Sequence, residues 1–109
     1  NDEWIEWARP GRYGIRESDT LNIAVARSED DERHICPLQL GTIERCIRLW
    51  TNTGETVLDP FAGIGSVPYE AVRLGRFGIG VELKSEYFRV AVRNVATAES
   101  LRGLGSLFS

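Results

Sequence analysis

The run Asp59-Pro60-Phe61-Ala62-Gly63-Ile64-Gly65-Ser66 contains residue types suited to holding a small charged ligand. An apolar segment precedes Asp59, so the run begins where a buried strand is expected to end. Gly63 and Gly65 let the backbone approach a ligand without an intervening Cβ atom. Backbone N–H groups at the start of a following helix favour a carboxylate or a phosphate. The run therefore predicts a ligand site at the carboxyl end of a parallel strand.

A second acid, Glu82, follows the next apolar segment and lies 19 positions after Gly63 (82 − 63). An acid about 20 residues beyond such glycines is well placed to hydrogen-bond ribose hydroxyls. Asp59 can accept hydrogen bonds from an ammonium group. Together these groups favour a nucleoside-type cofactor with a charged arm, and S-adenosylmethionine has both parts. Phe61 can lie against the methionine arm, because a sulfonium is attracted to an aromatic face.

Other nucleotide ligands fit the same residues less well. No lysine follows the glycines, which excludes a P-loop. A dinucleotide site requires a third small residue where helix and strand approach, and Pro68 occupies that position. A pyrophosphate would also be repelled by Asp59. Two alternatives stay open: a purely structural strand-to-helix turn, and a nicotinamide-binding domain.

The elements that must position these residues form a short α/β unit. We expect a strand at 55–58, a helix from Ser66 to about Leu74 and a second strand at 76–82, joined by a right-handed crossover. Ser66 is expected to cap the helix, and Pro68 lies in its first turn, where a missing N–H is harmless.

One helix is expected before this unit in the chain and another after it. An amphipathic helix precedes it, and its expected apolar face consists of Leu40, Ile43, Cys46, Ile47 and Trp50. A last helix starts at Ser85 and places Tyr87, Val90, Ala91, Asn94 and Val95 on one side. The glycines after Glu99 predict a frayed tail.

A short strand is expected at 21–26. The aromatic residues and arginines of 1–20 fit either a nucleic-acid groove or the cover of a core, and packing is the favoured interpretation.

Composition limits the classes of function. The chain has 109 residues, which is enough for one domain, and 42% of them are hydrophobic. A net charge of −3 argues against binding of nucleic acid through the overall charge of the domain. No run of 18 apolar residues predicts a membrane span, so a cytoplasmic location is expected. Cys36 and Cys46 match no zinc spacing, so we expect two buried free thiols and no metal site.

The glycine run resembles the cofactor motif of the DNA amino-methyltransferases, which methylate the exocyclic nitrogen of adenine or cytosine. Two flanking segments are also similar to that family: Arg33-His34-Ile35-Cys36-Pro37-Leu38-Gln39-Leu40 upstream, and Ile79-Gly80-Val81-Glu82-Leu83 with Tyr87-Phe88 downstream. The similarity covers about Arg33 to Val95, in the linear order of members whose catalytic half comes first. Leu38-Gln39 departs from the family pattern, because many relatives have Lys-Pro there.

The resemblance implies the fold and the roles of individual residues. It implies a partial Rossmann-like S-adenosylmethionine-dependent methyltransferase fold: α/β, with a few-stranded, mainly parallel sheet and flanking helices. The implied cofactor-binding residues are Asp59, Phe61, Ala62, Gly63, Gly65, Ser66 and Glu82, with His34, Cys36 and Pro37 near the methionine end. Glu82 would take the ribose, and Ser66 would cap the helix or touch the carboxylate. For His34, a surface or core imidazole is an equally good interpretation.

The family's catalytic motif places two adjacent prolines before an aromatic residue, beside a flipped-out base. None of the four prolines of this chain are adjacent, so no catalytic residue is assigned. We expect residues 1–32 to be the remnant of an upstream half, 33–99 the cofactor-binding region and 100–109 a tail. The chain then represents part of a bacterial or phage enzyme that acts on DNA, completed by a missing N-terminal half, by self-association, or by both. The alternative is an inactive, self-associating remnant.

Overall fold

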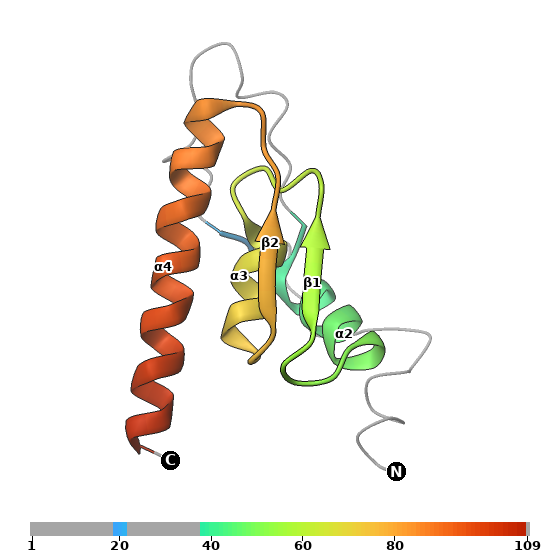
Figure 1. The fold of residues 1–109 in the computed structure, drawn as a ribbon, viewed down its shortest axis with the longest axis vertical. Helices are drawn as coiled ribbons and strands as arrows, with labels where there is room; N and C mark the ends of the chain where they lie inside the picture. Colours follow the sequence, from blue (N-terminus) through green and yellow to red (C-terminus); the bar gives the residue numbers. More distant parts are fainter. Residues whose placement is uncertain (1–18, 22–37, 109) are drawn as a thin grey trace.

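The computed structural model describes residues 19–21 and 38–108, with side chains as far as residue 105 (Figure 1). Its elements, labelled as in Figure 1, are α2 (Leu40–Trp50), β1 (Thr56–Asp59), α3 (Ser66–Arg73), β2 (Phe77–Gly80) and α4 (Ser85–Phe108). This order confirms the α/β class and the expected strand–helix–strand unit. The strand expected at 21–26 and the aromatic residues of 1–20 lie outside the described residues. No helix of the described segments is long and apolar enough to cross a membrane.

The two strands form a parallel pair, and their carboxyl ends lie at the same end of the sheet (Figure 1). Thr56 pairs with Phe77 at the start of the register, and Asp59 pairs with Gly80 at its end. Hydrogen bonds continue beyond the strands, because the Val81 N–H donates to the Asp59 carbonyl over 2.9 Å. The loop after β1 is therefore joined directly to the loop after β2.

Helix α3 lies on one face of the sheet and approaches β2 very closely. A Cβ atom added to Gly78 would lie 2.8 Å from the Pro68 carbonyl oxygen, and one added to Gly80 would lie 2.9 Å from Pro68 Cγ. A small residue at position 68 is therefore not needed for this approach, because the small residues that permit it are on the strand. Pro68 no longer argues against a dinucleotide ligand.

Helix α2 packs against α3 and contributes Ile43 and Ile47 to a core cluster with Ala71. These two isoleucines are four residues apart and define a narrower apolar face than the sequence predicts. Cys46 and Trp50 are exposed, so the prediction of a buried Cys46 thiol was wrong. They lie beside the buried face, where no described element covers them.

The amino end of α2 is held by a distant residue. The Asp19 carboxylate accepts a hydrogen bond of 3.0 Å from the Gly41 N–H, and its carbonyl accepts one of 2.7 Å from the Leu40 N–H. Gln39, at the N-cap position, makes no side-chain cap bond. A carboxylate at this position also complements the positive end of the helix dipole.

Charged side chains connect α2 to α3. Glu70 is only 1% exposed, and its carboxylate accepts two hydrogen bonds from Arg73, of 2.9 and 2.8 Å. Arg73 also donates to Glu44 of α2 over 2.9 Å. The hydrogen bond to Glu70 is the largest factor that raises the pKa of the Arg73 guanidinium above its ordinary value. Glu70 is thus buried as part of a fully bonded ion pair, the form in which a buried charge is tolerated.

Arg76 joins the end of α2 to the turn before β2. It is 7% exposed, and its guanidinium donates to Thr51 Oγ1 over 3.0 Å, the Thr51 carbonyl over 2.9 Å and the Leu74 carbonyl over 2.8 Å.

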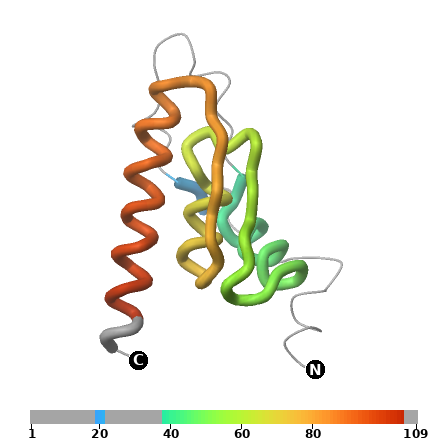
Figure 2. Tube along the Cα trace, in the orientation of Figure 1, coloured from blue at the N-terminus to red at the C-terminus, as the bar shows by residue number. Residues whose placement is uncertain are grey.

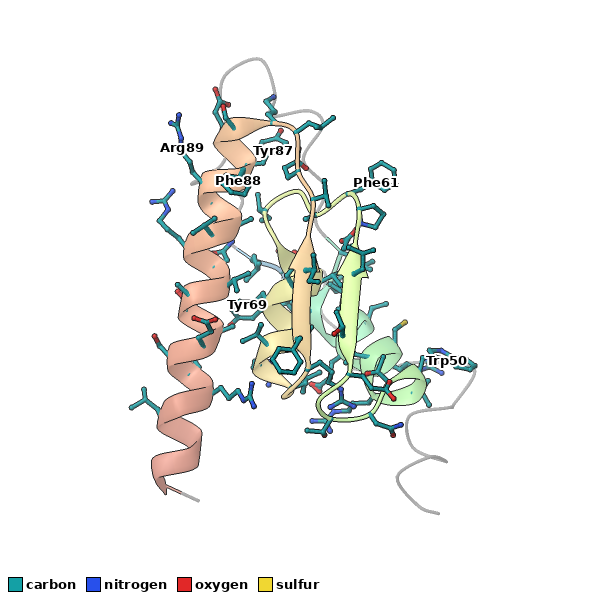
Figure 3. The ribbon with its side chains drawn as sticks, viewed as in Figure 1. Trp50, Phe61, Tyr69, Tyr87, Phe88 and Arg89 are labelled. Carbon is teal, nitrogen blue, oxygen red and sulfur yellow. The ribbon has the colours of Figure 1, made fainter. Side chains whose placement is uncertain are left out.

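Changing Arg76→Ala removes all three bonds and leaves two backbone carbonyls without their partner. Because bonds to charged groups contribute more than neutral ones, we expect the free energy of unfolding in urea to fall by about 2–4 kcal/mol. Arg89→Ala is the control, because Arg89 is exposed and points away from the molecule (Figure 3). An equal loss in both variants would contradict the role of Arg76.

Helix α4 runs along α3 as one long, nearly straight element (Figure 2). It continues through Gly103 and Gly105 to Phe108, so the prediction of a frayed segment after Glu99 was wrong. Each glycine costs a helix only ~1 kcal/mol relative to alanine, which is too little to end a helix whose neighbouring residues tolerate that conformation.

Candidate functional site

The structure brings the two acids predicted from the sequence to one end of the sheet. Asp59 ends β1, and Glu82 follows β2 by two residues. The loop of residues 60–65, called the glycine loop below, lies between them. The Glu82 carboxylate accepts a hydrogen bond of 2.9 Å from the Gly63 N–H through Oε1 and one of 2.8 Å from the Lys84 N–H through Oε2. Glu82 therefore holds the glycine loop as well as presenting oxygen acceptors at the strand end.

The first turn of the loop is organised by Asp59 itself. Its Oδ1 accepts a hydrogen bond of 2.9 Å from the Phe61 N–H, two residues later. Such a turn is typical of aspartate, whose short side chain can substitute for a backbone acceptor. The Phe61 ring is 87% exposed and projects beyond the end of β1 (Figure 3). No other described side chain covers it, so its face is accessible to a ligand.

The backbone of the second turn favours glycine at both positions. Gly63 and Gly65 have φ values of +57° and +88°, in the left-handed region that glycine adopts readily. Ala62 is buried, and its N–H donates to the Val81 carbonyl over 2.9 Å. The Gly65 N–H donates to the Ala62 carbonyl over 2.8 Å. The loop is thus closed on itself and on β2 before α3 begins.

Ser66 has a different role from the predicted helix cap. It is the first residue of α3, while Gly65 is the N-cap and makes no side-chain cap bond. Ser66 is buried, with 8% of its surface exposed. The cap prediction failed because Gly65, in the left-handed conformation, already takes the position before the helix. Contact of Ser66 with a ligand carboxylate stays a prediction.

Sequence reasoning missed the residues that support the loop from α4. The Asn94 side-chain amide donates a hydrogen bond of 2.8 Å to the Ile64 carbonyl, 30 positions away. Ala91 lies directly against Gly65, with 3.0 Å between Ala91 Cβ and the position of an added Gly65 Cβ. The helical spacing of these residues was visible in the sequence, but nothing in it pointed to the loop as their partner.

A cavity of 320 Å³ lies beside the site, between β2 and α4. It is lined mainly by small and apolar residues, with Glu82 and Glu99 as its acids: Ala62, Pro68, Gly78, Gly80, Glu82, Phe88, Ala91, Val92, Val95, Ala96 and Glu99. His34, Cys36 and Pro37 lie outside the described residues. Among the described residues, no group of three or more histidine, cysteine and acidic side chains could hold a metal ion.

A protein-family model described as DNA methylase matches the sequence over residues 2–93. The chain belongs to this DNA methylase family, of the N6/N4 type. It is 34% identical to the type II methyltransferase M.BglI of Bacillus subtilis over 96 residues, which is 88% of this chain and 25% of that protein. It is also 34% identical to the DNA adenine methyltransferase YhdJ of Escherichia coli K12 over 70 residues, 64% of this chain and 24% of that protein.

Solved structures of methyltransferases share the fold. The complex of M1.HpyAVI with S-adenosylmethionine superposes with a TM-score of 0.55 at 32% identity, over 63% of this chain and 34% of that one. TTHA0409 from Thermus thermophilus, complexed with S-adenosyl-L-methionine, gives 0.54 at 31% identity, over 83% and 41%. This methylase chain thus has an S-adenosylmethionine-dependent methyltransferase fold. It spans about a quarter of the length of these curated relatives.

Proposed function

We propose that this chain is the S-adenosylmethionine-binding portion of a DNA methyltransferase that methylates the exocyclic amino group of adenine or cytosine. The observation that carries the proposal is the pair of acids at neighbouring strand ends, Asp59 and Glu82, with the glycine loop bonded between them. The two complexed relatives support the same cofactor. Type II names among the relatives favour a role in restriction–modification.

The residues fit the chemical parts of the cofactor. Glu82 has two carboxylate oxygens at the end of β2, each bonded to one backbone N–H, and each can accept a further bond from a ribose hydroxyl. Asp59 would place a negative charge near the methionine ammonium and sulfonium of a bound cofactor. Phe61 offers an accessible ring to the same arm. The amino end of α3, beginning at Ser66, favours the methionine carboxylate.

The remaining assignments follow from the family resemblance. Ala62, Gly63 and Gly65 would form the backbone surface against the methionine part. His34, Cys36 and Pro37 would pack near its end. S-adenosylmethionine, when bound, supplies an electrophilic methyl group. The residues of this chain bind and orient that group, while the Pro-Pro-aromatic motif that holds the target base would come from a complementing part of the enzyme. We place such an enzyme in the cytoplasm, with DNA as its substrate.

Ligand-dependent thermal stability tests this proposal. A ligand that binds only the folded chain raises Tm, and at 100 times Kd it stabilises by about 2.7 kcal/mol. We expect S-adenosylmethionine and S-adenosylhomocysteine to raise Tm and NAD to leave it unchanged, because Asp59 repels a pyrophosphate. A larger shift with NAD would contradict the proposal and favour a nicotinamide-binding domain.

One face of the sheet supports a second candidate, an inactive module that self-associates. Helices α2 and α3 cover the opposite face, while this one is open among the described elements (Figure 1). Leu58 and Phe77 are 62% and 64% exposed on it, beside Ile79 and Val81. Soluble proteins rarely expose so many large apolar residues together without a partner. The face therefore suits either a complementing part of the enzyme or a second copy of the chain.

Molar mass in solution separates these two candidates. If a second copy covers the open face, light scattering will give a multiple of 12.2 kDa for the chain. Leu58→Lys combined with Ile79→Lys is then expected to restore the monomer, because two buried lysines cannot be tolerated in the contact. The control Val92→Lys changes an exposed apolar residue on α4 instead. A monomer that binds S-adenosylmethionine would contradict the self-associating remnant.

A further inference from the structure

Asn94 connects helix α4 to the centre of the glycine loop. Its Nδ2 donates a hydrogen bond of 2.8 Å to the Ile64 carbonyl, and the pair is partly buried. Ile64 is 4% exposed and packs against Val90 and Tyr87. Tyr87, Val90 and Asn94 are spaced three and four residues apart, so they share one face of α4. That face therefore holds the Ile64 side chain and its backbone carbonyl together.

The carbonyl that Asn94 holds is critical to the shape of the loop. It belongs to the same peptide plane as the Gly65 N–H, which donates to the Ala62 carbonyl. Glycine flanks Ile64 on both sides, and glycine readily adopts other backbone conformations. With no bond to the Ile64 carbonyl, this peptide plane could rotate and displace the Gly65 N–H from its acceptor. The Asn94 bond opposes that rotation.

A second contact limits the loop in a different way. Ala91 lies so close to Gly65 that a Cβ atom added there would be 3.1 Å from Ala91 Cα. This contact fixes the distance between α4 and the loop, but it does not favour any particular direction of the Ile64 carbonyl. Of the described residues, Asn94 supplies the polar contact from α4 that sets this direction.

We propose that Asn94 is a positioning residue for the cofactor loop and that it sets the affinity for S-adenosylmethionine without touching the cofactor. This inference rests on the proposed function. A loop that is already ordered loses less conformational freedom on binding, so it binds more tightly. The Gly63 N–H bond to Glu82 holds the loop from the β2 side, and the Asn94 bond holds it from α4.

The test compares two variants that remove the donor in different ways. Asn94→Asp keeps the shape and loses the N–H, and Asn94→Leu fills the same volume with an apolar group. We expect calorimetry to give a Kd for S-adenosylmethionine about 3- to 10-fold higher in each, which is the effect of one hydrogen bond on preorganisation. Thr97→Val is the control, because it deletes the bond to the Arg93 carbonyl on the same helix and does not reach the loop.

Amide hydrogen exchange gives a readout that a merely structural role would not change. We expect faster exchange at Gly63 and Gly65 in both Asn94 variants, with unchanged exchange in β1 and in the control. An unchanged Kd in a folded variant, or exchange that rises uniformly along the chain, would overturn the inference. If the unmodified chain does not bind S-adenosylmethionine, the proposed function fails, while the exchange result still decides whether Asn94 orders the loop.

Discussion

Replacing Glu82 with alanine is expected to weaken S-adenosylmethionine binding by about 100-fold, the largest effect of any single substitution at the site. Two losses contribute. The ribose hydroxyls lose a charged acceptor, and such bonds contribute about 1.5–3 kcal/mol. The Gly63 N–H also loses its 2.9 Å partner, so the glycine loop is released from β2.

Glu82→Gln separates these two losses. Its amide oxygen can still accept from Gly63, so the loop stays closed, while its NH2 group cannot accept from the Lys84 N–H and the negative charge toward the ribose is removed. We expect an affinity between those of the unmodified chain and Glu82→Ala. Glu86→Gln, at an exposed position in the first turn of α4, is the control and should bind normally. Equal affinity of Glu82→Ala and this control would exclude Glu82 from the site.

Gly65→Ala is expected to destabilise the fold by about 3 kcal/mol, against about 1 kcal/mol for Gly63→Ala. Both glycines have positive φ, which costs an alanine about 1–2 kcal/mol. The difference comes from packing. A Cβ at Gly65 would lie 3.0 Å from Ala91 Cβ, whereas nothing lies within 4 Å of one at Gly63.

Urea unfolding of the two alanine variants measures this difference directly. A double variant, Gly65→Ala with Ala91→Gly, removes the contact between the two Cβ atoms and should recover part of the lost stability, although the φ penalty and the 3.1 Å approach to the Cα atom of residue 91 stay. Equal destabilisation by the two single substitutions would contradict the close packing of α4 against the loop.

The site residues that could be predicted are those whose position follows from the sequence immediately around them. Asp59, the glycines and Glu82 come directly after apolar segments of strand length, and parallel strands bring their carboxyl ends together. Their proximity therefore followed from the pattern alone. The bond between Gly63 and Glu82 confirms that the two strand ends meet.

Other features depended on contacts that no local pattern contains. Asn94 is 30 residues from the carbonyl that it bonds, and Asp19 is 21 residues before the N–H of Leu40. Cys46 lies on the apolar side of α2 in a helical projection, yet the buried residues of this helix are Ile43 and Ile47, with Leu40 partly buried beside them. Helix periodicity gives the direction of a side chain, while the width of the covering element decides which side chains are buried.

Isothermal titration of the unmodified chain with S-adenosylmethionine tests the central claim most directly. Because the described site holds its two acids and its glycine loop in place through its own hydrogen bonds, we expect saturable binding of one cofactor per chain. S-adenosylhomocysteine is expected to compete for the same site. A chain that is folded by circular dichroism, unfolds cooperatively and gives no binding heat at several temperatures would contradict the claim.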